Sequence, residues 1–394
     1  MTRDEHLQAI LSMADKPLLL QIGTGIGKTR IALELLKKWD AKKIFILAPF
    51  HSIMLSWKEE MKKWKFDTEG KTIEIQCYAS IHKFAETKWD AVICDEGHHI
   101  TERCQEFFET IEFDHFVALS AFVPKAAKQR IRDIVPNIVE YRISARKAIE
   151  DNILPDPKVV LIKLFLNTKN NTECIVLNKG RGKPITVDWD NRKSYIEAKY
   201  PEIRINCTEW QYYNYVTAKI DTLKRQYFRS KKDFLKNLWL QKAGERLKWL
   251  ARHKNKYITW LMANTFKDMR TLIFCSDVKQ TEQLCPNAIN SKDSDTSMNI
   301  LAKFNEGKIN QIAACQMLNE GVNLVNCKLG MFAALNSSEI LQKQKLGRLL
   351  RHKEPVIVIP YFVATREEEI IEKMKQDYNP ELIQVVTSPK DIKL

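Results

Sequence analysis

The sequence predicts an α/β chain with two doubly wound parallel-sheet domains and a mainly helical insertion in the second domain. Short apolar runs alternate with helical patterns over the first 150 residues, as in a parallel sheet that is covered by helices. A second series of such runs begins near residue 158. The 394 residues are also too many for one ordinary hydrophobic core. We therefore expect domains at residues 1–152 and 158–394.

Four apolar runs of the first domain are expected to be buried strands. They are Pro17–Ile22, Lys43–Ala48, Trp89–Asp95 and His115–Ser120. Between the first two, the apolar residues of Lys28–Trp39 recur at helical spacing. This segment is therefore expected to be a helix that packs an apolar face on the sheet.

A short linker is expected at residues 153–157, because the two prolines of Ile-Leu-Pro-Asp-Pro stiffen the chain and discourage a helix. Strands of the second domain are expected at Lys158–Leu166, Thr271–Cys275, Gln311–Cys315, Leu329–Ala334 and Pro355–Phe362. An insertion of different composition, at about residues 167–268, separates the first of these strands from the others. We expect it to begin with a polar, hairpin-like part and to continue as a long helical segment to Asp268.

The positive charge of the chain is concentrated in this insertion. Residues 207–268 contain 14 Lys and Arg but only 5 Asp and Glu, so they carry +9 of the total formal charge of +14. Such a surface favours a polyanionic partner, and nucleic acid is the commonest one. Arg246, Lys248 and Lys254 are expected to contact a nucleic-acid backbone. The tryptophans among them, Trp210, Trp239, Trp249 and Trp260, are expected in the core of the helices rather than stacked on bases.

Composition also excludes several classes of protein. Nine cysteines without a C-x-x-C pair fit neither a disulfide framework nor a zinc knuckle. No apolar stretch reaches the length of a membrane span, and acidic residues near the N-terminus do not suit a secretion signal. We expect a soluble cytoplasmic protein, in the host cytoplasm if the chain is viral, that is monomeric or self-associates weakly.

A glycine-rich loop follows the first expected strand and precedes the first expected helix. It consists of Gly23, Thr24, Gly25, Ile26, Gly27, Lys28 and Thr29. In this context backbone N–H groups and the positive end of the helix can surround phosphate oxygens. Lys28 is expected to reach the β and γ phosphates of ATP, and Thr29 to bind Mg²⁺. The strict pattern requires glycine where this chain has Ile22, so a tight turn before a helix is the alternative for the loop alone.

Two carboxylates follow the third expected strand. Asp95 and Glu96 would lie at the carboxyl end of the sheet, which is the edge where α/β proteins bind ligands. Asp95 is expected to hold Mg²⁺, and Glu96 to orient or deprotonate the attacking water. An acidic turn after a strand is the alternative. The neighbouring His98 is expected to bridge this segment to the second domain.

An arginine pair lies in the other domain, within the segment Gln344–Arg351. Arg348 and Arg351 are three residues apart, so they share one helical face and can point together into a cleft between the domains. Such arginines stabilise the charge that develops on a transferred phosphoryl group. A basic surface helix is the alternative for this motif alone.

Together these motifs resemble those of the superfamily 2 DExH helicases, in the family's order and over nearly the whole chain. The matching segments are Gly25–Thr29 (motif I), Ile46–Pro49 with Leu55 and Trp57 (Ia), Tyr78–Ser80 (Ib), Asp95–His98 (II), Leu119–Ala121 (III), Leu272–Ser276 (IV), Leu318–Leu324 (V) and Gln344–Arg351 (VI). In its compact size the chain is most similar to helicases that bacteriophages carry. The resemblance implies two RecA-like domains that use ATP and Mg²⁺.

The resemblance also implies roles for individual residues. It assigns nucleic-acid contacts to Pro49, Tyr78, Ser80, Ser276 and Asn319, coupling of that track to ATP turnover to His98, Ser120 and Ala121, nucleotide binding to Gly321, and a catalytic role to Gln344 beside Glu96, Arg348 and Arg351. The chain departs from the family at Phe122, where a threonine is usual, and at Asn323, where many members have aspartate. Neither His6 nor Gln8 belongs to a full adenine-reading motif.

The expected function is that of an ATP-dependent DNA helicase or translocase. An RNA helicase is a second reading, disfavoured because the full Q-motif of the RNA-processing group is not evident. A nucleic-acid clamp that no longer hydrolyses ATP is a third. It is disfavoured because both carboxylates of motif II and both arginines of motif VI are present.

Overall fold

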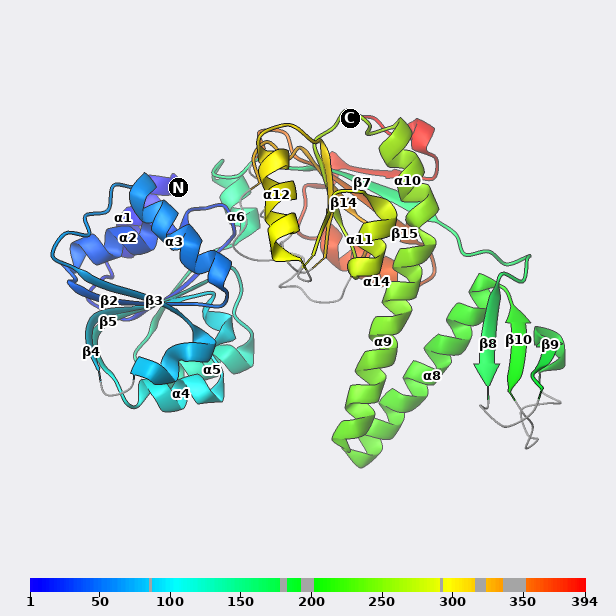
Figure 1. Cartoon of the computed structure of the whole chain (residues 1–394), viewed down its shortest axis with the longest axis horizontal. Coiled ribbons are helices and arrows are strands. Elements are labelled where there is room, and N and C mark those ends of the chain that lie inside the picture. The colour runs from blue at the N-terminus through cyan, green and yellow to red at the C-terminus, as the bar shows by residue number, and fades with distance from the viewer. Residues whose placement is uncertain (85–86, 178–182, 193–201, 291–292, 316–323, 336–351) are drawn as a thin grey trace.

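A computed structural model describes residues 1–84, 87–177, 183–192, 202–290, 293–315, 324–335 and 352–394 of the chain (Figure 1). The first sheet has six parallel strands in the order β3-β2-β4-β5-β1-β6. The strands are β1 (Leu18–Ile22), β2 (Lys43–Ala48), β3 (Thr72–Cys77), β4 (Lys88–Asp95), β5 (Glu112–Ser120) and β6 (Val139–Ile143). All four strands expected from the sequence are therefore confirmed, within three residues at each end.

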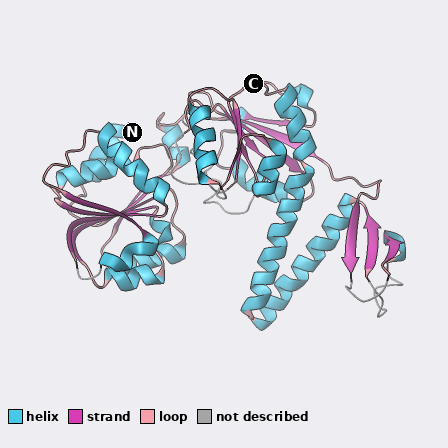
Figure 2. Cartoon of the chain, in the orientation of Figure 1, coloured by secondary structure: helices cyan, strands magenta, loops and turns pink. Residues whose placement is uncertain are grey.

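Helices cover both faces of this sheet (Figure 2). One face packs on α1 (Arg3–Leu11), α2 (Lys28–Lys38), α3 (His51–Lys63) and α6 (Ala145–Glu150), and the other on η1 (Tyr78–Phe84), α4 (Glu102–Phe108) and α5 (Lys125–Ile134). The expected helix is α2, whose apolar stripe of Ile31, Ala32, Leu35 and Leu36 is buried. Each face thus has its own apolar core, as a doubly wound sheet requires.

The second sheet has seven parallel strands in the order β12-β13-β11-β14-β15-β7-β16. The strands are β7 (Lys158–Leu164), β11 (Thr271–Phe274), β12 (Ala288–Ile289), β13 (Gln311–Ala314), β14 (Leu329–Phe332), β15 (Val356–Phe362) and β16 (Ile383–Val386). They pack on α10 (Asn255–Asn264), α11 (Val278–Leu284), α12 (Ser294–Asn305) and α14 (Arg366–Lys375). The expected fold class, two parallel-sheet α/β domains, is confirmed.

The insertion leaves the second domain after β7. Its first part is a sheet of β8 (Glu173–Leu177), β10 (Ile203–Cys207) and β9 (Ile185–Asp188), in which β10 pairs antiparallel with β8 but parallel with β9. Two long helices follow, α8 (Glu209–Ser230) and α9 (Asp233–His253), and they project from the domain as an arm (Figure 1). The expected hairpin is thus a three-stranded sheet, and the expected single helical segment is divided.

We propose that the insertion ends earlier than the sequence pattern indicates. Ile258, Leu261 and Met262 of α10 are buried in the core of the second sheet. Because α10 belongs to that core, we place the end of the insertion near Lys254 rather than at Asp268. Residues 151–157, between α6 and β7, form neither helix nor strand, and we propose the boundary between the domains there. Among the described residues, no helix is long and apolar enough to cross a membrane.

Candidate functional site

The glycine-rich loop lies between β1 and α2. Gly25 and Gly27 have φ angles of 88° and 108°, a region that residues with side chains rarely adopt. The N–H of Gly23 donates to the carbonyl of Ile143 at 3.1 Å, which fixes the loop to the end of β6. Lys28 is the first residue of α2, so the unpaired N–H groups of the first helical turn face the loop. This is the geometry of a phosphate site.

Lys28 and Glu96 form an ion pair at the centre of the site. Lys28 Nζ lies 2.8 Å from Glu96 Oε1, and only 12% of each side chain is exposed. A phosphate group that enters the loop would compete with Glu96 for this ammonium group. Glu96 itself has a φ of 48°, an unfavourable conformation for a residue with a side chain. The chain leaves the regular strand at Asp95, and the Glu96 carboxylate faces the loop, where it contacts Lys28.

Asp95 is buried and held from two sides. Trp57 Nε1 donates to its Oδ2 at 2.8 Å, and the N–H of Glu96 donates to its Oδ1 at 3.0 Å. Burial, and next the charge of Glu96, raise the pKa of Asp95 to about 6, although Lys28 and the two hydrogen bonds favour its charged form. A divalent cation would favour the ionised carboxylate, and oxygen is the ligand atom that Mg²⁺ prefers. The donor set therefore fits Mg²⁺.

Ser120 connects this site to the loop that follows β5. Its side chain is fully buried. Its Oγ lies 3.2 Å from Glu96 Oε2, 2.9 Å from His98 Nδ1 and 2.8 Å from the carbonyl oxygen of Phe122. The structure thus joins the expected coupling residues His98 and Ser120 to Glu96. The bridge from His98 to the second domain stays a prediction.

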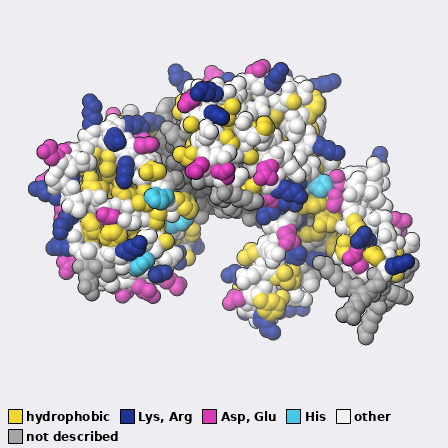
Figure 3. Space-filling model, in the orientation of Figure 1, with side chains coloured by type: hydrophobic (Ala, Val, Ile, Leu, Met, Phe, Trp, Pro, Cys, Tyr) yellow, Lys and Arg dark blue, Asp and Glu magenta, His cyan; other side chains and the backbone are white. Residues whose placement is uncertain are grey.

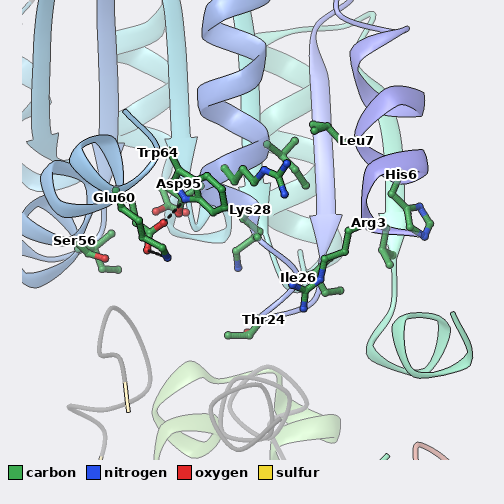
Figure 4. Close-up of a pocket in the computed structure, with 18 of the residues that line it drawn as sticks. Arg3, His6, Leu7, Thr24, Ile26, Lys28, Ser56, Glu60, Trp64 and Asp95 are labelled. Atoms are coloured by element: carbon green, nitrogen blue, oxygen red, sulfur yellow. Dashed lines mark hydrogen bonds and ion pairs between the residues drawn. The ribbon is translucent and has the colours of Figure 1, made fainter. Parts of the chain in front are cut away.

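A cavity of about 450 Å³ extends from the loop (Figure 4). Besides the loop, it is lined by Arg3, His6 and Leu7 of α1, by Ser56, Glu60 and Lys63 of α3, by Trp64, and by both carboxylates of motif II. The Arg30 guanidinium lies over the Trp64 ring, 4.7 Å from its centroid. The volume suits a nucleotide. His6 is engaged elsewhere, since its ring nitrogens bond to Tyr141 and Asp151.

Two of the expected nucleic-acid contacts are wrong. Lys254 is completely buried and pairs with Glu367, with 2.6 Å between Nζ and Oε1, so it cannot reach a backbone phosphate. Tyr78 is buried as well, and its hydroxyl donates to the backbone carbonyl of Asp95 at 2.9 Å. Both side chains support the fold of their surroundings. A one-dimensional pattern could not separate them from exposed neighbours.

The other expected contacts are at least partly accessible. Pro49, Ser80, Ser276 and Arg246 are half-buried, and Lys248 is exposed. Arg246 Nη1 donates to Thr217 Oγ1 at 2.9 Å, so its guanidinium is partly committed within the arm. Asn319, Gly321, Asn323, Gln344, Arg348 and Arg351 lie outside the described residues. Their roles stay predictions.

Sequence reasoning missed the contribution of α3. The sequence pattern places Trp57 in a motif but does not identify it as the donor to Asp95, and it predicts no role for Glu60 or Trp64. One signal was available: Trp57, Glu60 and Trp64 are spaced by three and four residues, so they share a face of the helix that follows β2. Because β2 pairs with β4, that face lies beside Asp95.

Two family models match the chain. "Type III restriction enzyme, res subunit" matches residues 3–125, and "Helicase conserved C-terminal domain" matches residues 253–353, which together are more than half of the chain. The matches contain the glycine-rich loop with both carboxylates, and the arginine motif, respectively.

One relative and two solved structures are similar along most of the chain. The DNA 3'-5' translocase XPB2 of Sulfurisphaera tokodaii is 21% identical over 375 residues, which are 89% of this chain and 79% of that protein. A fragment of the HsdR subunit of a type I restriction enzyme from Vibrio vulnificus has a TM-score of 0.57 at 16% identity and covers 100% of this chain and 69% of its own. The helicase domain of Hef from Pyrococcus furiosus has a TM-score of 0.46 at 13% identity, with coverage of 94% and 98%.

Proposed function

The chain belongs to the superfamily 2 helicases and ATPases, and on this premise we propose that it is a motor that moves along DNA. As a member of the family it hydrolyses ATP. We further propose which residues bind and hydrolyse ATP, which metal ion assists them and which form of DNA the chain moves along. These proposals rest above all on the ion pair of Lys28 with Glu96, beside a buried Asp95.

ATP occupies the cavity beside the glycine-rich loop, with its phosphates against the first turn of α2. Lys28 exchanges Glu96 for the β and γ phosphates, while Thr29 and Asp95 would hold Mg²⁺. The ion would supply charge neutralisation at the phosphates. Glu96, released from Lys28, accepts a proton from the attacking water. ATP binding therefore frees the catalytic base that is otherwise paired with Lys28.

The second domain completes the site. Gln344, Arg348 and Arg351 contribute from the motif that matches the helicase C-terminal model, and an arginine in such a position is worth about 10³ to 10⁵ in rate. Hydrolysis then requires the cleft to close. Ser120, which contacts both Glu96 and His98, links the γ-phosphate region to the loop after β5. We assign the coupling between hydrolysis and movement to that link.

DNA is favoured over RNA because the relative that matches 89% of this chain is described as a DNA translocase. The net charge of +14 agrees with either nucleic acid. From the same relative we adopt 3'-to-5' movement along the bound strand. A clamp without ATP turnover is disfavoured, because the ionic network of Lys28, Glu96 and Ser120 is intact.

Displacement of streptavidin from biotinylated oligonucleotides tests this proposal. The purified chain should use ATP to displace streptavidin from the 5' end of a single DNA strand faster than from the 3' end, and Lys28→Ala should do neither. Matched RNA strands, at the same stated salt concentration, should be poorer substrates. Equal rates at both DNA ends, or preference for RNA, would exclude the proposed direction or the proposed substrate, respectively.

A further inference from the structure

The arm of α8 and α9 is rooted at the expected nucleic-acid track. Arg252, near the end of α9, pairs with Asp277 at 2.8 Å, directly after Ser276 of motif IV. The side chain of Gln280 on α11 donates to the carbonyl of Ala251 at 2.9 Å. The root is therefore fixed to the second domain, and the opposite end of the arm is distant from it (Figure 1).

The far end of the arm is strongly basic. We call residues 224–239, where α8 turns into α9, the arm tip. Its cations are Lys224, Arg225, Arg229, Lys231, Lys232 and Lys236, all of them exposed, and its one acidic residue is Asp233. Six cations so close together repel one another, which costs folding stability. Their concentration indicates an anionic partner.

Aromatic side chains lie among these cations. Phe228 and Phe234 are 53% and 62% exposed, and they gain little from burial in the chain itself. Phe228 contacts Tyr227 and Trp239, with ring centroids 5.4 Å and 6.2 Å apart. Lys231 Nζ lies 4.9 Å from the centroid of the Phe228 ring. Apolar and positive side chains are seen together at this end of the arm in Figure 3.

The two-helix arm explains why these rings are accessible. A pair of helices buries only one stripe of each helix, so Phe228 and Phe234, which lie outside that stripe, stay accessible. Trp210 and Trp249 are half-buried and pack against a buried apolar cluster, in agreement with the expected helix core. Trp239 at the tip is half-buried, and Trp260 of α10 is 47% exposed, so the expectation is wrong for Trp260. Accessible rings with interleaved cations are the combination that binds single-stranded nucleic acid, in which bases stack and phosphates meet positive charge.

The tip lies too far from the root to act on the same short segment of DNA. Phe234 and Arg252 are 18 residues apart on α9, so they are separated by roughly 27 Å along the helix axis. At about 0.1 M salt, charges are screened beyond roughly 10 Å. The tip cations are therefore largely screened from phosphates that would bind at the root of the arm. A strand on the tip is either a second strand or a distant part of the first.

We propose that the arm tip is a second single-stranded DNA site, which binds the strand that the motor does not grip. Phe228 and Phe234 stack on unpaired bases, and the surrounding lysines and arginines contact the phosphates. The substrate class is then forked DNA with two unpaired tails, rather than one single strand. This inference rests on the proposed function, because it requires one strand to be held by the two domains.

Binding of three DNAs tests the inference. A fork with two tails is compared with the two duplexes that carry only one of its tails, by fluorescence anisotropy at 0.1 M salt. The wild-type chain should bind the fork at least about fivefold more tightly than the better single-tailed duplex. The double variant Phe228→Ala/Phe234→Ala should lose the preference for the fork. Its affinities for the fork and for both single-tailed duplexes should lie within about twofold of the wild-type affinity for a single-tailed duplex.

Two further variants control this experiment. Phe165→Ala removes a phenylalanine that is 68% exposed but follows β7 instead of lying on the tip, and it should keep the preference for the fork. Lys231→Glu/Lys232→Glu should lose it, because phosphates would be repelled. A wild type without the preference, or a tip variant that retains it, would overturn the inference. ATP turnover stimulated by a short single strand should be equal in wild type and tip variants, whereas turnover that ignores DNA altogether would instead contradict the proposed function.

Discussion

The two carboxylates at the end of β4 are adjacent in sequence but differ in their partners. Asp95 is 7% exposed and accepts from a tryptophan and a backbone N–H, so it is fixed in place. Glu96 contacts Lys28 and Ser120, both of which can change partners when a nucleotide binds. A fixed carboxylate suits a metal ligand. An exchangeable one suits a base.

Glu96→Gln should separate binding from chemistry. The amide oxygen can still accept from Lys28 but cannot take a proton, so turnover should fall by about 10² to 10⁴ while ATP still binds. Lys28→Ala should reduce ATP binding as well, because it removes a phosphate contact. Steady-state turnover and binding of a fluorescent ATP analogue check this pair of variants. If Glu96→Gln left turnover unchanged, Glu96 would not be the base.

Trp57→Phe should destabilise the first domain, because it removes a hydrogen bond to a buried carboxylate, while a smaller aromatic ring stays in place of the indole. Hydrogen bonds to charged groups contribute about 1.5–3 kcal/mol. Trp39→Phe is a matched control, since Trp39 Nε1 donates at 2.7 Å to the neutral carbonyl of Ala14. Trp39→Phe should lower the free energy of unfolding by less, about 0.5–1.5 kcal/mol, because its hydrogen bond is to a neutral group. Urea unfolding measures both, and an equal loss in the two variants would show that the charge of Asp95 does not strengthen its bond.

Among the elements, the central strands could be predicted from sequence and the edge strands could not. The central β1, β2, β4 and β5 are nearly continuous apolar runs because both faces of each are covered by helices. The edge strands β3 and β6 have mixed burial, so their polar residues obscure the pattern. In the second domain, the edge strand β16 also has mixed burial, and the sequence pattern does not predict it either.

The candidate site also has a part that the sequence predicts and a part that it does not. The loop from Gly23 to Thr29 and the carboxylates at 95 and 96 are contiguous in sequence, and short motifs could therefore locate them. The contacts of Trp57, Trp64 and Arg3 arise from packing between separate elements. The expectation that Lys254 contacts nucleic acid is wrong because its burial also arises from packing between separate elements. Its partner Glu367 is 113 residues away in the sequence.

The ion pair of Lys254 with Glu367 anchors the junction of α9 and α10 to α14. Both side chains are fully buried, and Glu367 also accepts from the N–H of Phe362 at 3.0 Å. Lys254→Met and Glu367→Gln should each lower the free energy of unfolding by about 3–5 kcal/mol, because one partner is left buried without its counterpart. The double variant should lower it by clearly less than the sum of the two single losses. Additive losses in urea unfolding would show that the two groups do not depend on each other.

A second ion pair attaches the small sheet to the arm, and it should make that attachment depend on pH. His253 Nε2 lies 2.9 Å from Glu173 Oε1 of β8. Burial lowers the pKa of His253, but the hydrogen bonds to Glu173 and the Trp249 carbonyl outweigh it and hold the pKa above 6.5. The pKa of Glu173 lies below 4.5, because the bonds from His253 and Trp249 outweigh its burial.

The pair should therefore stabilise the insertion at mildly acidic pH. A histidine with a raised pKa contributes fully below its unfolded value of 6.5, and the contribution is lost as pH rises through the folded pKa. The stabilisation that Glu173 contributes is lost at more acidic pH, as pH falls through its folded pKa. Urea unfolding followed by tryptophan fluorescence should show a more stable insertion at pH 5.5 than at pH 8.5. His253→Gln should remove this difference, and a difference that persisted in the variant would have another origin.

At the scale of the whole molecule, the proposed mechanism divides the groups that ATP hydrolysis needs between two domains. Lys28 and Thr29 begin α2, Asp95 and Glu96 lie at the end of β4, and the arginine motif follows β14 in the sequence. Neither domain has a complete set. In the proposed mechanism, a DNA strand held across both domains favours their closure, and closure brings the arginines to the phosphates.

The rate of ATP turnover with and without DNA tests this account most directly. We expect DNA to raise the turnover of the wild-type chain. Arg348→Ala should lower the DNA-stimulated rate by about 10³-fold or more while ATP still binds, because it removes only the contribution of the second domain. Turnover that is the same with and without DNA, or an Arg348→Ala variant that is stimulated like the wild type, would contradict an ATP-driven DNA motor whose two domains must close.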